Sequence, residues 1–294
     1  MRIGIAGLGK MGHALAERLQ EVGHSVVVWN RSPDKTRDIV AAGAEAAPSP
    51  RDLAESVEVV ITVLTDATAL DTVYRGPHGL LHANLTGKLV IEMSTVQPET
   101  DVALAKEVEA AGAAFVECPV GGTVGPARSG KLIGLVGGAE ADVARARPIL
   151  ESLCRRIEHV GPVGAGASMK LAINLPLLVF YQALGEALTL CRHLGQDPKW
   201  LMEFFADTSG GANVLKVRGP AIAEALAGGH PAPAFDVASI RKDLRTMVAE
   251  AKTRGASLPL AERTLAIYDE AAQEGWDSYD GSSLPSYWPT HAGK

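Results

Sequence analysis

The sequence predicts an α/β domain with a doubly wound parallel sheet, followed by an all-α domain. The chain has 294 residues, and a typical domain has about 150. Short apolar runs alternate with helix-periodic segments up to about residue 160, and no strand pattern returns after Gly166. We therefore expect the first domain over residues 1–162 and the helical domain over residues 163–294.

Seven short apolar runs are expected to form the strands of the first domain. Their continuous Val, Ile and Leu content indicates burial on both faces, which is typical of a parallel sheet covered by helices. Between the first two runs, Met11–Val22 has helical periodicity and ends at Gly23, which completes a βαβ unit. The expected strands span residues 2–6, 25–29, 58–63, 88–92, 114–117, 132–136 and 156–160.

The second domain is expected to begin with one long helix, Ser168–Leu194. This helix is apolar on nearly all sides, so it should be buried between layers or between subunits. Its most apolar part, Leu171–Phe180, contains Asn174 and Pro176, and we expect it to be too short and too interrupted to span a bilayer. Further helices are expected over residues 198–208, 213–226, 238–254 and 259–274, with an irregular end from Gly281.

The turn between the first strand and the first helix is rich in glycine. Gly7 allows a tight turn, Gly9 lets the backbone approach a pyrophosphate, and Gly12 lets the helix pack closely on the strand. The N–H groups at the start of the helix would then bind the diphosphate. Such a turn also occurs without a ligand, but its place inside a βαβ unit favours a Rossmann-type dinucleotide site. The segment reads Gly7-Leu8-Gly9-Lys10-Met11-Gly12.

The end of the second strand distinguishes NAD from NADP. A carboxylate there would bind the ribose 2′-hydroxyl and repel a 2′-phosphate. This chain instead has Asn30, Arg31 and Ser32, an amide, a guanidinium and a hydroxyl that suit a phosphate. The alternative is that Arg31 simply begins the next helix. The pattern favours NADP, with NAD less expected.

A second glycine-rich turn, residues 161–166, leads into the long helix. Lys170 and Asn174 follow at positions i and i+4, which lie on one helix face. An ammonium group on an apolar helix is costly unless it has a partner or a task, and near a carbonyl it would supply a proton during hydride transfer. The alternative is a lysine near a helix end whose charged head reaches solvent.

Together these motifs resemble the β-hydroxyacid dehydrogenases. That family includes 3-hydroxyisobutyrate dehydrogenase, tartronate semialdehyde reductase and the glyoxylate/succinic semialdehyde reductases, and it is related to 6-phosphogluconate dehydrogenase. The resemblance covers nearly the whole chain. Further motifs at the family's spacing are Glu92-Met93-Ser94-Thr95, Phe235, Lys242-Asp243-Leu244 and Asp280-Gly281-Ser282.

The resemblance implies a role for each matching residue. Lys170 would be the catalytic acid and base, and Asn174 would contact the substrate. Ser94 and Thr95 would lie beside the nicotinamide, with Ser94 also near the substrate, and Lys242 would reach cofactor or substrate. Three further residues, Leu64, Thr65 and Asp66, would face the cofactor.

Two positions depart from the family pattern. The substrate loop of the family usually carries a serine that helps to bind the substrate carboxylate, and this chain has Gly121 there. Backbone N–H groups at Gly121 and Gly122, or the hydroxyl of Thr123, would still bind an anion. Pro176 lies within the catalytic helix, where it removes one hydrogen bond and predicts a bend just beyond Asn174.

Composition excludes several other classes. The net charge is −6, so the chain lacks the basic field that nucleic-acid binding needs. Its three cysteines are far apart, which argues against a disulfide framework or a zinc site and fits a reducing compartment. A strand begins at Arg2, which leaves no room for a signal peptide. We expect a cytoplasmic protein without a membrane segment or a metal site.

The sequence therefore predicts an NADP(H)-dependent oxidoreductase that acts on a small aldehyde or ketone, or on the matching 3-hydroxyacid. The active site is expected between the domains, and the apolar helix suggests a homodimer or homotetramer formed through the helical domain. An imine reductase is the second hypothesis, although those enzymes generally have Asp or Tyr where this chain has Lys170. A non-catalytic NADP-binding protein is the third.

Overall fold

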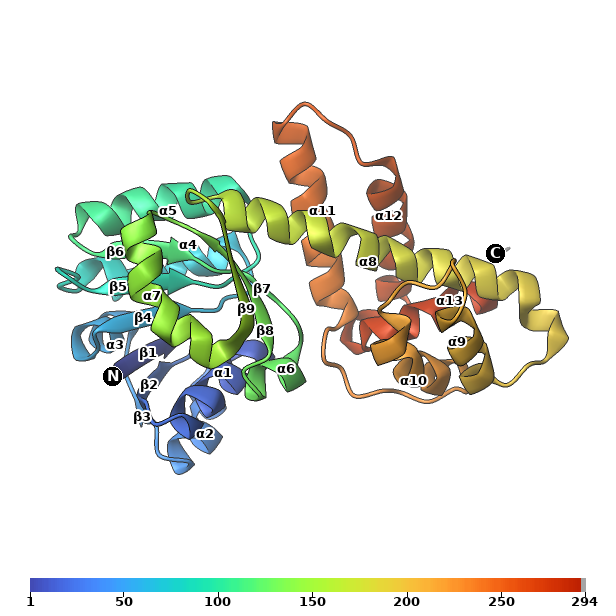
Figure 1. Ribbon diagram of the computed structural model, residues 1–294, viewed down its shortest axis with the longest axis horizontal. Coiled ribbons are helices and arrows are strands. Elements are labelled where there is room, and N and C mark those ends of the chain that lie inside the picture. Colours follow the sequence, from blue (N-terminus) through green and yellow to red (C-terminus); the bar gives the residue numbers. More distant parts are fainter. Residues whose placement is uncertain (292–294) are drawn as a thin grey trace. The chain divides into compact units, whose positions relative to one another are not determined.

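The computed structural model describes residues 1–291 and divides into two compact units, residues 1–171 and 172–294 (Figure 1). The boundary falls inside one long helix, α8 (Ala165–Cys191), so this helix contributes its first turns to the first unit and the rest to the second. The two units are described separately below.

The first unit is built on a sheet in the order β3-β2-β1-β4-β5-β6-β8-β7, with β9 paired to β8. Strands β1 to β6 are parallel, as expected, and β1 lies where the strand order reverses. The strands are β1 (Arg2–Ala6), β2 (Ser25–Trp29), β3 (Glu45–Ala46), β4 (Val59–Thr62), β5 (Leu89–Glu92), β6 (Ala114–Glu117), β7 (Val120–Gly121), β8 (Leu132–Gly137) and β9 (Cys154–Gly161).

The far end of the sheet differs from the prediction in two ways. The sheet is mixed, because β8 pairs antiparallel with both β6 and β7. In addition, β9 is not buried on both faces: most of its residues are exposed or half-buried, since it pairs only with β8. Its charged residues, Arg155, Arg156 and Glu158, suit an edge strand better than a core strand.

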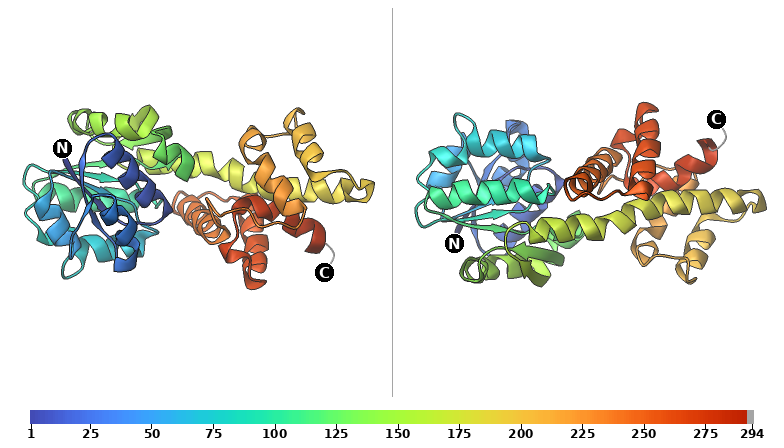
Figure 2. Two further views of the ribbon diagram at one scale, coloured as in Figure 1. Left: turned by 90° about the horizontal axis from the view of Figure 1, so that it is seen from below. Right: turned by 90° about the horizontal axis from the view of Figure 1, so that it is seen from above.

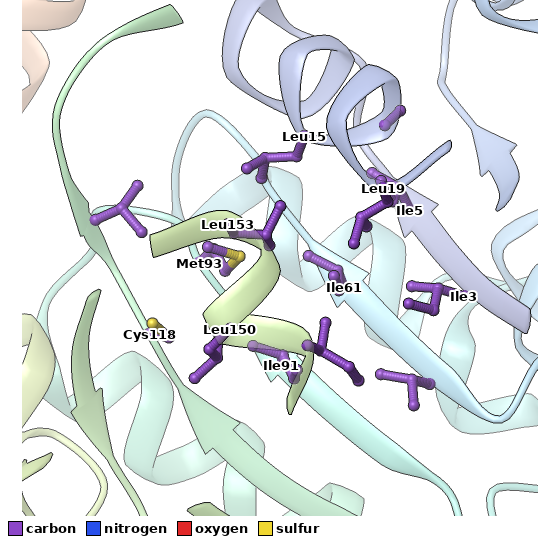
Figure 3. Close-up of a cluster of buried hydrophobic side chains, with 14 of the residues drawn as sticks. Ile3, Ile5, Leu15, Leu19, Ile61, Ile91, Met93, Cys118, Leu150 and Leu153 are labelled. Carbon is purple, nitrogen blue, oxygen red and sulfur yellow. The ribbon is translucent and has the colours of Figure 1, made fainter. Parts of the chain in front are cut away.

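Helices cover both faces of the sheet (Figures 1 and 2). On one face, side chains of α1 and α7, such as Leu15 and Leu150, pack against Ile5, Ile61 and Ile91 of the strands (Figure 3). A second apolar cluster, to which α3, α4 and α5 contribute, occupies the other face. The helices are α1 (Lys10–Glu21), α2 (Arg37–Ala41), α3 (Pro50–Ser56), α4 (Ala67–Arg75), α5 (Pro98–Ala110), α6 (Val124–Arg128) and α7 (Glu140–Leu153).

In the described residues the second unit contains helices and no strand (Figure 2). Its last helix was not expected, since the chain from Gly281 onward has no clear periodicity. Leu284 and Tyr287 are nevertheless buried, and the ring of Tyr287 stacks on His291, so tertiary packing stabilises the helix. After α8 come α9 (Pro198–Ala206), α10 (Leu215–Leu226), α11 (Val237–Thr253), α12 (Pro259–Gln273) and α13 (Leu284–His291).

Helix α8 corrects the expectation that its apolar part is short and interrupted. Its helical conformation continues through Asn174 and Pro176, because one missing hydrogen bond does not outweigh the bonds of the turns on either side. By length and composition alone, residues 165–194 would be long and apolar enough to cross a membrane, because they contain an 18-residue stretch with a mean hydropathy of 1.4. However, 44% of that stretch is buried within the protein, as in a core helix, so the finding is weak support for a membrane segment.

Candidate active site

The first glycine-rich turn lies between β1 and α1, at the carboxyl edge of the parallel strands. Gly7 has a φ of +104°, a conformation that favours glycine. A Cβ atom on Gly7 would lie 2.3 Å from the carbonyl oxygen of Val63, and one on Gly12 would lie 1.9 Å from that of Gly7. Glycine is therefore required at both positions by contacts within the protein.

Gly9 is different, because a Cβ atom there would meet no protein atom within 4 Å. Its φ of −67° is also open to any residue. The fold itself thus does not require glycine at position 9. The space in front of the helix start fits the close approach of a dinucleotide diphosphate, which the sequence predicts at this turn.

Asn30, just after β2, holds this turn in place. Its Oδ1 accepts a hydrogen bond from the Leu8 N–H at 2.9 Å, and its Nδ2 donates to the Ser32 carbonyl oxygen at 3.0 Å. The side chains of Arg31 and Ser32 are exposed beside it, and so is that of Lys10 at the start of α1. Leu8 is buried and Met11 is partly buried against the core, so these two residues can offer a cofactor mainly their backbone.

The loops after β4 and β5 are joined by Ser94. Its Oγ accepts a hydrogen bond from the Leu64 N–H at 2.8 Å, and its own N–H donates to Glu92 Oε1 at 2.5 Å. Thr65 is exposed and Thr95 half-buried, both at the same edge of the sheet as Gly7. Asp66 caps α4 through the Ala69 N–H, so its carboxyl group has a structural role that the sequence analysis did not assign to it.

Glu92, the last residue of β5, is fully buried beneath Ser94. Thr62 donates a hydrogen bond to its Oε2, and the hydroxyl of Tyr74 lies 2.9 Å from the Thr62 hydroxyl. Burial raises the pKa of Glu92 to about 7, although hydrogen bonds from Ser94 and Thr62 lower it. Two hydrogen bonds thus fix Ser94: its N–H group donates to the buried Glu92 carboxyl group, and its hydroxyl oxygen accepts from the Leu64 N–H group.

The loop with Gly121, where the family pattern has a serine, follows β6. Gly121 ends β7, where it pairs with Ile133 of β8, and Gly122 has a φ of +127°. A Cβ atom on Gly122 would lie 2.7 Å from a methyl carbon of Leu132. Thr123 precedes α6, and its side chain makes no capping hydrogen bond to that helix.

Lys170 lies in the second turn of α8 and belongs to the first unit, like the glycine-rich turn at residues 7–12. Only 8% of its surface is exposed, although the neighbouring Met169 is 42% exposed. The ammonium group therefore does not simply extend into solvent, as a lysine near a helix end usually does. This burial agrees with a task for Lys170.

Asn174 and Lys242 belong to the second unit, and Asp243 links them. Asn174 Nδ2 donates to Asp243 Oδ2 at 3.1 Å, and Lys242 Nζ lies 2.5 Å from Asp243 Oδ1. Asp243 is 3% exposed and Asn174 8% exposed. The carboxyl group of Asp243 thus sets the orientation of the Asn174 amide and holds the Lys242 ammonium group beside it.

The sequence assigned no role to the buried acidic residues Glu92, Glu117 and Asp243, to which the structure gives hydrogen-bond partners. Glu92 and Glu117 each end a fully buried parallel strand, where an acidic residue has to have donors around it. An acidic residue at the end of an apolar strand was therefore the sequence feature that could have identified Glu92 and Glu117. Asp243 follows Lys242 directly in the sequence. This spacing does not reveal whether the Asp243 carboxyl group is buried or exposed to solvent. No group of acidic, His or Cys residues within residues 1–291 is arranged to hold a metal ion.

Comparison with known proteins places these observations in a family. Residues 2–161 match the NAD binding domain of 6-phosphogluconate dehydrogenase, and residues 164–288 match the NAD-binding domain of NADP-dependent 3-hydroxyisobutyrate dehydrogenase. The chain is also 36% identical to 3-hydroxyisobutyrate dehydrogenase of Pseudomonas aeruginosa, over 99% of both chains. The chain belongs to the β-hydroxyacid dehydrogenase family.

Other members of the family support the same assignment. The chain is 32% identical to glyoxylate/succinic semialdehyde reductase 1 of Arabidopsis thaliana, over 97% of both chains. A solved structure described as a complex with NADP+ and a second ligand is 28% identical, with a TM-score of 0.86, over 97% of this chain and 99% of that one. Like its family, the protein is an NAD(P)-dependent oxidoreductase that acts on CH–OH groups.

Proposed function

We propose that this β-hydroxyacid dehydrogenase uses NADP(H) and interconverts a small semialdehyde or ketone with its 3-hydroxyacid, with Lys170 as the general acid and base. The observation that carries the proposal is the burial of Lys170, which is 8% exposed on a predominantly apolar helix and belongs to the unit that carries the glycine-rich turn. A buried ammonium group is costly, so a proton-transfer role accounts for its presence better than packing does.

The cofactor would lie along the carboxyl edge of the sheet. Gly9 leaves room for the diphosphate in the turn that Gly7 and Gly12 shape. Leu64, Thr65, Asp66 and Thr95 follow the neighbouring strands. Asn30, Arg31 and Ser32 after β2 include no carboxylate, which favours a 2′-phosphate over a free 2′-hydroxyl. A matching family model described as NADP-dependent supports the same choice.

The proton transfer follows from the chemistry of the lysine. The bound cofactor supplies a hydride to the carbonyl carbon of the substrate. The Lys170 ammonium group donates a proton to the carbonyl oxygen, and in the reverse direction the neutral amine accepts the hydroxyl proton. Asn174, whose amide is oriented by Asp243, would contact the substrate, and Lys242 would contact substrate or cofactor.

The carboxylate of the substrate needs hydrogen-bond donors, which the loop after β6 would supply. Gly121 offers no side chain in place of the family serine, so we assign this task to the N–H groups of Gly121 and Gly122 and the hydroxyl of Thr123. Ser94 would bind the substrate from the neighbouring loop.

Substitution Lys170→Ala tests the proposal. We expect kcat to fall by about 1,000-fold or more, because the proton donor is lost, while the Kd for NADPH changes less than about threefold. NADPH oxidation would be followed with a panel of semialdehydes, and binding by NADPH fluorescence. If the variant kept its turnover, Lys170 would not be the general acid and base.

The same panel, extended with cyclic imines, tests the two other hypotheses. Turnover of imines alone would identify an imine reductase, and NADPH binding without turnover of any compound in the panel would indicate a non-catalytic protein. Turnover of semialdehydes, lost in Lys170→Ala, is the result that we expect.

The assembly is part of the proposal as well. We infer a cytoplasmic homodimer or homotetramer formed through the helical domain, because α8 and the helix after it leave large apolar side chains exposed in the single chain.

A further inference from the structure

The side chain of Glu117 joins the sheet of the first unit to the start of α8. Glu117 is the last residue of β6 and is fully buried. Its Oε1 accepts hydrogen bonds from the N–H groups of Gly164 at 2.6 Å and Gly166 at 2.7 Å, and its Oε2 accepts one from Ala167 at 3.3 Å. The first N–H groups of a helix have no partner inside the helix, and here a carboxyl group from a distant strand supplies one.

Two glycines make the space for this carboxyl group. A Cβ atom on Gly137 would lie 2.1 Å from Glu117 Oε1, and one on Gly166 would lie 3.2 Å from the same oxygen. Any side chain at position 137 would therefore displace the carboxyl group. Close packing on two sides, together with three hydrogen bonds, leaves Glu117 essentially one position.

Asp101 of α5 completes the surroundings of Glu117. It is fully buried, and within residues 1–291 no N–H or O–H group donates to either of its carboxyl oxygens. The carboxyl groups of Glu92 and Glu117 lie near it. Burial, the neighbouring Glu117 carboxyl group and the charge of Glu92 raise the pKa of Asp101 well above its ordinary value. This shift favours the protonated form of Asp101 beside Glu117.

We propose that Glu117 is a positioning residue for the reaction: by holding the N–H groups of Gly164, Gly166 and Ala167, it determines where Lys170 stands. Lys170 follows Ala167 by three residues, a rise of about 4.5 Å along the helix axis, so a displacement of the first turn moves the lysine with it. A misplacement of about 1 Å in a reacting group can cost about 100-fold in rate. This inference rests on the proposed role of Lys170.

Substitution Glu117→Gln tests the inference with little change of shape. The amide oxygen still accepts from Gly164 and Gly166, which preserves the fold, but a neutral acceptor binds N–H groups more weakly and the amide nitrogen cannot accept from Ala167. We expect kcat to fall by about 10-fold, with the Kd for NADPH changed less than about twofold. Glu250→Gln is the matched control, because Glu250 is another buried carboxyl group, on α11, and its loss should leave kcat unchanged.

Two further measurements separate positioning from a general loss of structure. Backbone amide hydrogen exchange over residues 162–170, measured without cofactor, should be faster in Glu117→Gln and unchanged in Glu250→Gln. In a Lys170→Ala background, single-turnover rates at high enzyme concentration should fall less than about twofold on adding Glu117→Gln, because a residue that acts through Lys170 has nothing left to position.

The outcomes are distinct. A similar loss of rate in both backgrounds, or unchanged hydrogen exchange, would overturn the positioning role. Full activity of Glu117→Gln beside an inactive Lys170→Ala would overturn it too, and leave the proposed function intact. Full activity of Lys170→Ala would contradict the proposed function and, with it, the inference.

Discussion

Three fully buried carboxyl groups, Glu92, Asp101 and Glu117, lie in the first unit. Glu92 and Glu117 each accept several hydrogen bonds from N–H or O–H groups, whereas Asp101 accepts none in the described part of the chain. A buried carboxyl group without donors is most stable when it is protonated. The protonation of Asp101 therefore affects the free energy of unfolding, and this makes the free energy depend on pH.

The contribution of Asp101 to stability should fall as pH rises above the ordinary pKa of an aspartic acid, near 4. The folded protein keeps Asp101 protonated there, while the unfolded chain releases the proton, so rising pH favours unfolding by at most about 1.4 kcal/mol per pH unit. Asp101→Asn removes this penalty, since an amide does not ionise. In urea unfolding at pH 5, 6.5 and 8, the variant should gain stability over the natural protein as pH rises.

Glu92 contributes a loss of stability in the same direction, between its ordinary pKa of 4.5 and its folded value of about 7. Glu92 is present in both proteins, and its contribution cancels in the difference as long as Asp101 stays protonated, because a neutral acid and an amide affect the Glu92 charge alike. A variant less stable than the natural protein at all three pH values would show that Asp101 is ionised in the fold.

Arg31 is the residue on which the choice of cofactor depends. Its exposed guanidinium group follows β2, where the 2′-phosphate of NADPH would lie. Arg31→Ala should weaken NADPH binding by about 10-fold or more and NADH binding less than about twofold, since only NADPH has that phosphate. Fluorescence titration with both cofactors measures this. Equal losses would indicate that Arg31 does not contact the phosphate.

At the scale of elements, the glycine-rich turn shows how one motif serves two purposes. Gly7 and Gly12 let α1 pack against β1 and the loop after β4, and this requirement comes from the protein alone. Gly9 has no such contact, so its purpose lies in what approaches the helix start. Substitution by alanine at each position distinguishes a glycine that the fold requires from one that the cofactor requires.

Gly12→Ala should destabilise the protein by about 2 kcal/mol, because a Cβ atom 1.9 Å from the Gly7 carbonyl oxygen forces α1 to move. Gly9→Ala should leave the thermal midpoint unchanged and weaken NADPH binding by about 10-fold or more, because the methyl group occupies the space of the diphosphate. Calorimetry and fluorescence titration give the two quantities. Unchanged NADPH affinity in Gly9→Ala would place the diphosphate elsewhere.

At the scale of the molecule, apolar side chains exposed in the second unit point to an assembly. Leu190 is 80% exposed at the end of α8, and Trp200 and Phe204 of α9 are about half exposed with their rings stacked 5.0 Å apart. Such side chains are usually covered in the functional form of a protein. We therefore propose that these side chains are buried between copies of this chain.

We expect light scattering to give the mass of a dimer or tetramer in buffer without detergent. Leu190→Glu should shift the mass toward the monomer, since it places a charge in the apolar surface. Val40→Glu is the matched control, because Val40 is an exposed apolar residue of the first unit and its change should leave the mass unaltered. A monomer at all concentrations would contradict the proposed assembly.

The sequence by itself predicted the longer strands of the first unit and the position of the glycine-rich turn. Both depend on local physical rules: apolar runs predict buried strands, and a φ of +104° at Gly7 favours glycine whatever the rest of the chain does. It also identified the lysine on the apolar helix, because a charge among apolar neighbours is visible in the sequence.

Only the tertiary structure decided which groups surround these residues. Glu117 meets Gly164 and Asp243 meets Asn174 across separations of 47 and 69 residues, and no spacing rule connects them. The helix Leu284–His291 likewise forms because Tyr287 and Leu284 are buried by distant segments, against a weak local pattern. Hydrogen bonds and burial between distant segments depend on how the chain folds back on itself, and that information is spread over the whole sequence.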